Sequence, residues 1–161
     1  MERVLPLVKP LLGIAVVVGS LRFVLSVAHA PRPIVYAASL TAVELAGMIY
    51  LAVRVAREPD LGYRHLWLAN LLLFGLCQLL TIAGMLYTYA TGTATLYHET
   101  ERLREFLGYD PSPLAHIGMH VLNWMVIAPT IATWVFGAPI VWGARRAQAG
   151  RRAQGRSGAV S

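Results

Sequence analysis

Four long blocks of apolar residues leave this chain few structures to fold into. They run from about Val4 to Ala28, Pro33 to Val53, Leu66 to Ala90 and Pro113 to Trp142. A helix needs about 20 mostly apolar residues to cross about 30 Å of hydrocarbon, and each block is long enough. No block alternates apolar and polar residues as a barrel strand does, so we expect four transmembrane helices.

The composition agrees with this interpretation and excludes several other classes of protein. Hydrophobic residues make up 57% of the 161 positions and charged residues only 14%, whereas soluble domains carry about 25% charged residues. The single Cys77 cannot form a disulfide bond within the chain. We therefore exclude a disordered chain, a soluble nucleic-acid-binding protein and a disulfide-stabilised scaffold. We predict an all-α, integral membrane four-helix bundle that forms one domain over residues 1–143.

The charges between the apolar blocks predict the orientation in the membrane. The N-terminus, the 54–65 loop and the C-terminal tail lie on one side and carry ten basic and three acidic residues, a net charge of +7. The connections on the other side carry three basic and four acidic residues, a net charge of −1. Because basic residues stay in the cytoplasm, we expect both termini there, the 91–112 loop outside, and insertion in an inner or plasma membrane.

An alternative for the first block is a cleaved signal peptide. Val27-Ala28-His29-Ala30 resembles the small-residue cleavage site of a secretory signal, and it follows a basic start and an apolar run. Arg22 interrupts the block and Pro31 follows the site, which favours an uncleaved helix. Cleavage would leave three spans, and the rest of the chain would keep the same orientation.

The segment between the third and fourth blocks is longer than a tight turn requires. Over residues 94–107 its apolar side chains fall broadly on one side of a helical wheel, with charged residues elsewhere. We expect a short amphipathic helix on the outer membrane surface, capped by Gly108. Ser112 is a suitable N-cap, and Pro113 a suitable first residue, for the fourth transmembrane helix.

The C-terminal residues 144–161 differ in composition from the rest of the chain. They repeat an Arg-Arg-Ala-Gln unit and are rich in Gly, Ala and Ser, without an apolar face. We expect a disordered cytoplasmic tail near anionic lipid headgroups, each Arg adding up to about 1 kcal/mol of attraction. Nucleic-acid binding is the alternative for such a basic tail, but no other feature supports it, so no nucleic-acid partner is predicted.

Small residues and prolines indicate how the helices pack. Ala38, Ala42 and Ala46 recur at spacing four in the second block. Such stripes allow helices to approach closely in lipid, where interhelical hydrogen bonds add to the association. Pro129 and Pro139 lie within the fourth block, where each removes an intrahelical hydrogen bond, and we expect the helix to bend there.

Two histidines in the fourth block are the strongest candidates for a functional site. His116 and His120 are spaced i, i+4, so both imidazoles project from one helix face near its outer end. His98 and Glu101 share a face of the expected surface helix. Imidazole and carboxylate groups together hold Zn, Fe or Cu, so we predict a metal site with these four residues as ligands.

Further residues are expected around this site. Asn123, which continues the face of the two histidines, and Glu99 are predicted to orient the ligands through hydrogen bonds. A haem b held by histidines from two helices is an alternative, with His29 or His98 opposite the fourth helix. Histidines at a membrane interface also hydrogen-bond headgroups and water without binding a cofactor, and the sequence leaves this interpretation open.

A second candidate site lies inside the membrane. Arg22 in the first block and Glu44 in the second fall at compatible depths on antiparallel helices, with Gln78 of the third block nearby. Ionisable residues at such depth are costly and usually pair within the bundle, so we expect an Arg22–Glu44 ion pair that Gln78 extends. Such a pair either fixes the register of the helices or, with Glu44 as a proton carrier, supports transport.

These patterns lead to one preferred function and two alternatives. We expect a small subunit or module whose outer His/Glu site binds a transition metal or haem and works in electron transfer. The alternatives are a structural subunit of a larger membrane complex without a cofactor, and a small transporter or channel using Arg22 and Glu44. The expected partners are membrane lipids and either further copies of the chain or a larger complex. No motif decides whether the protein is an enzyme.

Overall fold

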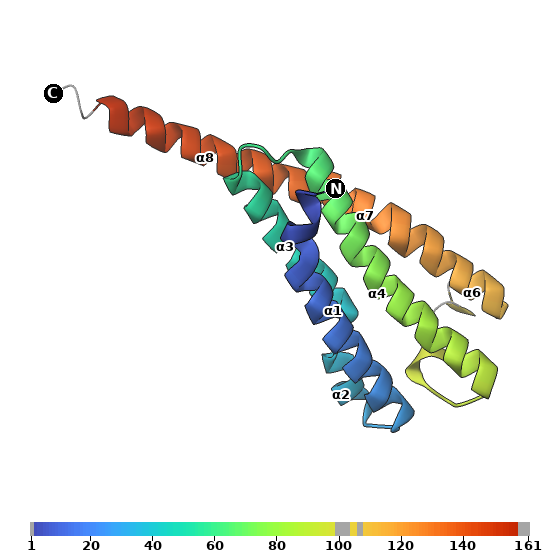
Figure 1. Cartoon of the computed structure of the whole chain (residues 1–161). Helices are drawn as coiled ribbons and strands as arrows, with labels where there is room; N and C mark the ends of the chain where they lie inside the picture. The colour runs from blue at the N-terminus through green and yellow to red at the C-terminus, as the bar shows by residue number, and fades with distance from the viewer. Residues whose placement is uncertain (1, 99–103, 106–107, 158–161) are drawn as a thin grey trace.

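The chain folds into four long helices, two of them built from several segments (Figure 1). The computed structural model describes residues 2–98, 104–105 and 108–157, and over these the chain is helical and contains no strand. The first long helix is α1, Val4–Val27, and the third is α4, Tyr63–Thr91. All four helices are long and apolar enough to cross a membrane. The sequence prediction of four apolar helices is therefore confirmed.

The second helix is interrupted near its start. α2 spans Arg32–Ala37 and α3 spans Leu40–Arg57. Between them Ala38 leaves the helical conformation, with a ψ of 67°, and the Ser39 hydroxyl accepts a hydrogen bond from the backbone amide of Ala42. A serine side chain can hydrogen-bond to backbone amides and so stabilise the first turn of a helix. The block that we expected to form one helix therefore contains a second helix start, at Ser39.

The fourth helix is continuous but unevenly wound. Its segments are α6 (Pro113–Met119), η2 (His120–Ile127), α7 (Ala128–Ile131), η3 (Ala132–Gly137) and α8 (Ala138–Ser157). η2 and η3 are π-helical. Pro129 has no amide proton for the carbonyl of Met125, and wider turns form beside such a gap. The hydroxyls of Thr130 and Thr133 donate to the carbonyls four residues earlier. The irregularity expected at Pro129 thus takes the form of widened turns.

Helix α4 lies at the centre of the bundle and packs against the other three long helices. We call the two ends of the bundle the terminal end, where α1 starts and α8 leaves, and the loop end, where α1 and α4 finish and α6 begins (Figure 1). Fully buried leucines such as Leu51 and Leu66 pack toward the terminal end. Buried Glu44, Gln78 and His116 lie in the middle and toward the loop end. Fully buried leucines therefore mark the terminal half of the bundle, and the buried Glu44 and His116 lie in the other half.

The start of the segment after α4 folds into the bundle instead of lying on its surface. Gly92 ends α4 with a φ of 69°, and the single turn η1, Leu96–His98, follows. The Tyr97 ring is buried against Gly84, where an added Cβ would lie 2.8 Å from the ring, and the Leu96 amide donates to Ser26 Oγ at 2.8 Å. The amphipathic surface helix expected over residues 94–107 is therefore wrong for its first residues. Residues 99–103 and 106–107 lie outside the described part of the chain.

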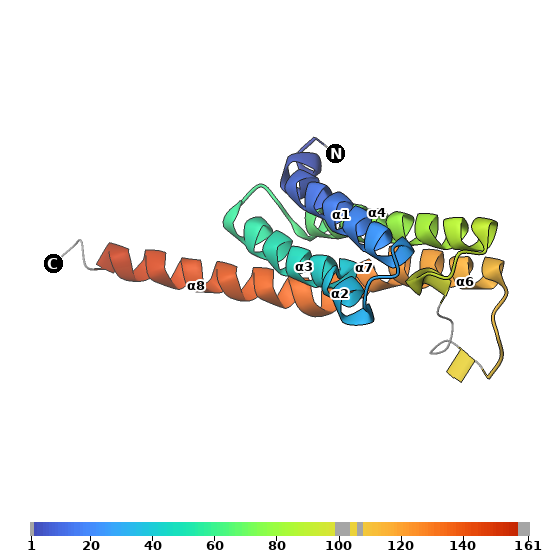
Figure 2. The ribbon, with the colours of Figure 1, turned by 90° about the horizontal axis from the view of Figure 1, so that it is seen from below.

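The basic C-terminal segment also differs from its expected structure. The sequence predicts disorder from residue 144, whereas α8 continues as a helix to Ser157 and projects beyond the bundle (Figures 1 and 2). Ala, Arg and Gln are strong helix formers, so a segment without an apolar face still extends the helix that precedes it. The Arg146 guanidinium lies 4.0 Å from the centre of the Trp142 ring, a cation–π contact on the helix surface.

A single arginine joins α8 to the end of α3. The Arg145 guanidinium donates hydrogen bonds to the backbone carbonyls of Val55, Glu58 and Leu61. The last carbonyls of a helix have no partner within the helix, and a cation near them also interacts favourably with the negative end of the helix dipole. Arg145 therefore stabilises the α3–α4 connection from α8, which packs against α3.

We predict that Arg145→Ala destabilises the fold by about 2–3 kcal/mol, because it leaves partly buried carbonyls without their charged donor. Arg146→Ala is the matched control and should cost less than about 1 kcal/mol, since it loses only a surface cation–π contact. Cys77 is fully buried, so its reaction with a thiol dye during heating reports unfolding. Equal melting temperatures for the two variants would contradict this role of Arg145.

Candidate functional site

A chain of hydrogen bonds connects three helices in the middle of the bundle. Glu44 of α3 is 1% exposed, and Gln78 Nε2 of α4 donates to its Oε1 at 2.8 Å. The other end of the Gln78 amide, Oε1, lies 2.9 Å from Nδ1 of His120, the first residue of η2. Gln78 is therefore held at both ends, by a carboxyl group on one side and an imidazole on the other.

This arrangement fixes the tautomer of His120. An amide oxygen only accepts hydrogen bonds, so Nδ1 of His120 must carry the proton that it shares with Gln78. In a neutral imidazole the other nitrogen, Nε2, then has a free lone pair. The carboxyl group of Glu44 orients the Gln78 amide, and the orientation of that amide determines which ring nitrogen of His120 carries the proton.

The second histidine lies one turn away with a partner of its own. His116 is 7% exposed, and its Nδ1 lies 3.1 Å from the hydroxyl oxygen of Tyr89 near the end of α4. The His116 and His120 rings are 5.3 Å apart between centroids, with their planes inclined at 56°. The expectation that both rings share one side of the helix agrees with this contact.

The spacing of the two rings is compatible with a shared metal ion. A metal about 2.1 Å from a ring nitrogen lies roughly 3.2 Å from the ring centre, so two imidazoles at a tetrahedral angle have centres about 5 Å apart. The observed 5.3 Å matches this separation. No group of three or more His, Cys, Asp or Glu side chains that could hold a metal ion gathers among the described residues.

Local sequence explains how the histidines reach this position. The Ser112 hydroxyl accepts from the Ala115 amide and Pro113 occupies the first turn, so α6 begins one turn before His116. π-Helical turns begin at His120, and such turns occur often at functional sites. Because η2 winds with i→i+5 spacing, Asn123 no longer continues the histidine face, and its side chain is exposed. The role expected for Asn123 therefore has no support in this geometry.

The expected ion pair between Arg22 and Glu44 is absent from the described residues. The Arg22 guanidinium instead lies 6.0 Å from the centre of the Tyr97 ring, and its Nε is buried without a hydrogen-bond partner. Glu44 bonds to Gln78, which lies at the same depth on the central helix α4. The predicted association of Glu44 with Gln78 is thus found, whereas Arg22 lies closer to the loop end beside Tyr97.

The remaining predicted site residues lie elsewhere or outside the described chain. His29 follows the end of α1 with a φ of 53° and lines a separate cavity of about 260 Å³ with Ser26, Arg32 and Thr95. The side chain of His98, and all of Glu99 and Glu101, lie outside the described residues. The structure therefore places His29 apart from the histidine pair and describes only the backbone of His98, the last residue of η1.

Sequence reasoning missed the link between Gln78 and His120 and so divided one network into two sites. Gln78 lies in the middle of the third block and His120 about one-quarter of the way into the fourth, so their positions along the two blocks did not indicate a shared depth. A second pair of polar contacts joins the same helices: Asn70 Nδ2 donates to Thr133 Oγ1 at 2.9 Å, and Trp67 Nε1 donates to Thr130 Oγ1 at 3.1 Å.

No known protein family, curated protein or solved structure matches this chain.

We predict that Gln78→Leu allows His120 to adopt either neutral tautomer, because the Nδ1 proton loses the amide oxygen that accepts its hydrogen bond. Nitrogen-15 NMR of histidine-labelled protein should show a protonated Nδ1 for His120 in the unmodified protein and a mixture of tautomers in the variant. Thr81→Val is the control on the same helix, since the Thr81 hydroxyl donates only to the Cys77 carbonyl. An unchanged His120 signal in Gln78→Leu would mean that the amide does not orient the imidazole.

Proposed function

We propose that the four helices span an inner or plasma membrane with both termini in the cytoplasm and the 91–112 loop outside. The length and hydropathy of the helices support insertion. The net charge of +7 carried by the termini and the 54–65 loop supports the orientation. In this orientation the terminal end of the bundle is cytoplasmic, and His116 and His120 lie toward the outer side.

Labelling of single cysteines tests this orientation. In a Cys77→Ser background, Asp110→Cys should react with a membrane-impermeant maleimide in intact cells. Gly150→Cys should react only after the membrane is opened, because α8 extends into the cytoplasm. Labelling of Gly150→Cys in intact cells would overturn the proposed orientation.

The function that the site supports best is transition-metal binding by His116 and His120. The observation that carries this proposal is the anchoring of each Nδ1, by Gln78 for His120 and by Tyr89 for His116. Histidines that bind metals commonly use one ring nitrogen as the ligand while the other is held by a hydrogen bond to a neighbouring group. Nε2 of His120 is then free to bind Zn, Fe or Cu, with further coordination positions open to other ligands.

The alternative of proton transport along the same residues is less well supported. A proton path needs groups that both accept and release protons, and Glu44 and His120 are such groups. Gln78 stands between them, and its amide neither gains nor loses a proton in the normal pH range. The chain of hydrogen bonds is therefore better suited to holding His120 in one orientation than to conducting protons.

A haem with two histidine ligands also fits this geometry less well than a single ion. Axial ligands of one haem approach from opposite faces, whereas His116 and His120 belong to one side of one helix. His29, the alternative partner, lines a different cavity. We therefore propose a mononuclear metal site in a small membrane module, which with Fe or Cu would carry electrons within a homo-oligomer or a larger membrane complex.

Metal analysis of detergent-purified protein, prepared without chelator, tests the proposal. We expect Co²⁺ to bind at one ion per chain with the absorption bands of imidazole ligands, and no Soret band. His116→Ala and His120→Ala should each weaken binding by at least about 100-fold, more than the loss of an orienting group costs. His29→Asn is the control, because Asn tolerates the same left-handed backbone conformation. Unchanged Co²⁺ binding in a folded variant that lacks both histidines would overturn the proposed site, and a folded unmodified protein that binds no Co²⁺ would support a structural subunit instead.

A further inference from the structure

Asn123 presents an amide group to the surroundings of the bundle from the fourth helix. Its side chain is exposed and makes no hydrogen bond with any described residue. The π-helical turns that begin at His120 carry it away from the histidine face, where α-helical spacing would place it. The polar group that the sequence assigned to the metal site is therefore available to a partner outside the chain.

Two contacts place Asn123 near the middle of the bundle along its length. Three residues earlier, His120 Nδ1 lies 2.9 Å from Gln78 Oε1 of α4. Two residues later, Met125 Cε lies 3.9 Å from the position of a Cβ on Gly75 of α4. Gln78 and Gly75 are both close to the centre of the 29-residue helix α4. In a membrane with about 30 Å of hydrocarbon, Asn123 is therefore far from either headgroup layer.

An exposed amide at this depth needs a hydrogen-bonding partner from another molecule. Hydroxyl side chains can bond to their own helix, as Thr130 does by donating to the carbonyl of Val126. Asn123 has no bond of this kind, and lipid tails offer neither a donor nor an acceptor. Asparagine side chains commonly satisfy this need by hydrogen bonding between transmembrane helices. The geometry therefore favours a helix of another molecule at this position.

The surface around Asn123 is apolar and is not covered by the bundle. η2 packs mainly against α4, and Figure 1 shows α4 between α1 and this part of the fourth helix. Val126, Ile127 and Ile131 follow Asn123 along the helix and are 50%, 42% and 49% exposed. Residues three and four apart are neighbours on a helix surface, so these side chains extend the face that carries the amide.

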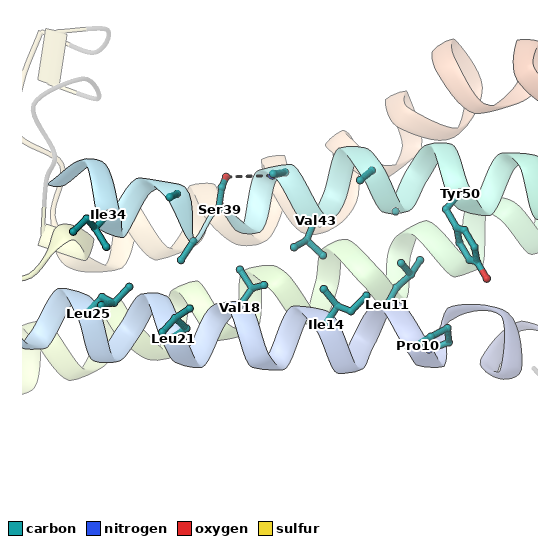
Figure 3. A pocket seen from close by; sticks show the side chains of 15 residues that line it. Pro10, Leu11, Ile14, Val18, Leu21, Leu25, Ile34, Ser39, Val43 and Tyr50 are labelled. Atoms are coloured by element: carbon teal, nitrogen blue, oxygen red, sulfur yellow. Dashed lines mark hydrogen bonds between the residues drawn. The ribbon is translucent and has the colours of Figure 1, made fainter. Parts of the chain in front are cut away.

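A second uncovered surface, the groove between α1 and α3, lacks such a group in its middle. There Val18 of α1 and Val43 of α3 line the walls (Figure 3). The Ser39 hydroxyl, farther along the groove, already accepts from the backbone amide of Ala42. The middle of this groove therefore offers no polar contact that would select a partner, in contrast to the face of Asn123.

Symmetry makes a second copy of the chain the partner that fits the amide. All copies insert with the same orientation, so two copies that meet through this face have parallel fourth helices. Around a twofold axis along the membrane normal, each Asn123 then meets its counterpart at the same depth. A primary amide carries both donors and an acceptor, so each Nδ2 can donate to the Oδ1 of the other copy. A different protein would need a polar group at this same depth.

We propose that a second copy of the chain binds along η2 and α7. The two Asn123 amides hydrogen-bond to each other, and Val126, Ile127 and Ile131 pack around them. This dimer rests on the proposed membrane insertion and names the partner within the proposed homo-oligomer. It does not rest on the metal site, because His116 and His120 contact α4 on another side of the helix.

Energy transfer between labelled copies in liposomes tests the amide pair. In a Cys77→Ser background, chains labelled at Gly150→Cys should dimerise as the lipid is reduced. Asn123→Val should weaken dimerisation about tenfold, the effect of lost interhelical hydrogen bonds, and Asn123→Gln should retain most of it. Ser20→Val is the control, since Ser20 is an exposed polar residue on α1. Unchanged dimerisation of Asn123→Val would overturn the proposal, and so would a chain that is monomeric at every dilution.

Disulfide cross-linking in the same membranes tests the position of the contact. In the Cys77→Ser background, Ile127→Cys should form a disulfide between copies, and adding Asn123→Val should reduce its yield. Val17→Cys is the matched control, because Val17 is 67% exposed on α1 and should not cross-link. Equal cross-linking at both positions would overturn the assigned surface. Maleimide labelling reports insertion separately, so an inserted monomer contradicts the dimer alone, whereas a chain that does not insert contradicts both proposals.

Discussion

The hydrogen bond from Gln78 to Glu44 is the contact on which the loop half of the bundle depends. A carboxyl group 1% exposed in an apolar helix is costly unless a donor reaches it, and Gln78 of the neighbouring helix supplies one. Because the amide is then fixed in direction, its oxygen must face the next helix, where it meets His120. One buried interaction thus sets the register of α3, α4 and η2 and the tautomer of an imidazole.

The loop half of the bundle combines polar contacts with an interrupted backbone, and this combination leaves room for a site. Toward the terminal end, apolar packing around Leu51 and Leu66 is joined by the buried Asn70–Thr133 hydrogen bond and by the Arg145 bonds to the end of α3. Toward the loop end, Glu44, Gln78 and His120 connect three helices, beside the break at Ser39 and the π-helical turns from His120. Irregular backbone and polar contacts at membrane depth are typical of sites that bind ligands.

Sequence alone predicted the four apolar helices well, because length and hydropathy are local properties. It also placed His116 and His120 on one face, which follows from i, i+4 spacing. It failed where distant residues decide the outcome. Arg22 was expected beside Glu44 because charge and depth agreed, but the sequence does not reveal that Gln78 reaches the carboxyl group first. Tyr97 was expected on the surface because no local pattern shows that Gly84 leaves space for its ring.

The most direct measurement is a double-mutant cycle between Gln78 and His120 on Co²⁺ affinity. If the amide acts by orienting the imidazole, Gln78→Leu alone should weaken Co²⁺ binding by about 10–100-fold. In the His120→Ala background the same change should then have no further effect, so that the two losses are strongly coupled. Independent, additive losses, or a Gln78→Leu variant that binds Co²⁺ as tightly as the unmodified protein, would contradict a metal site organised by the buried Glu44–Gln78 pair.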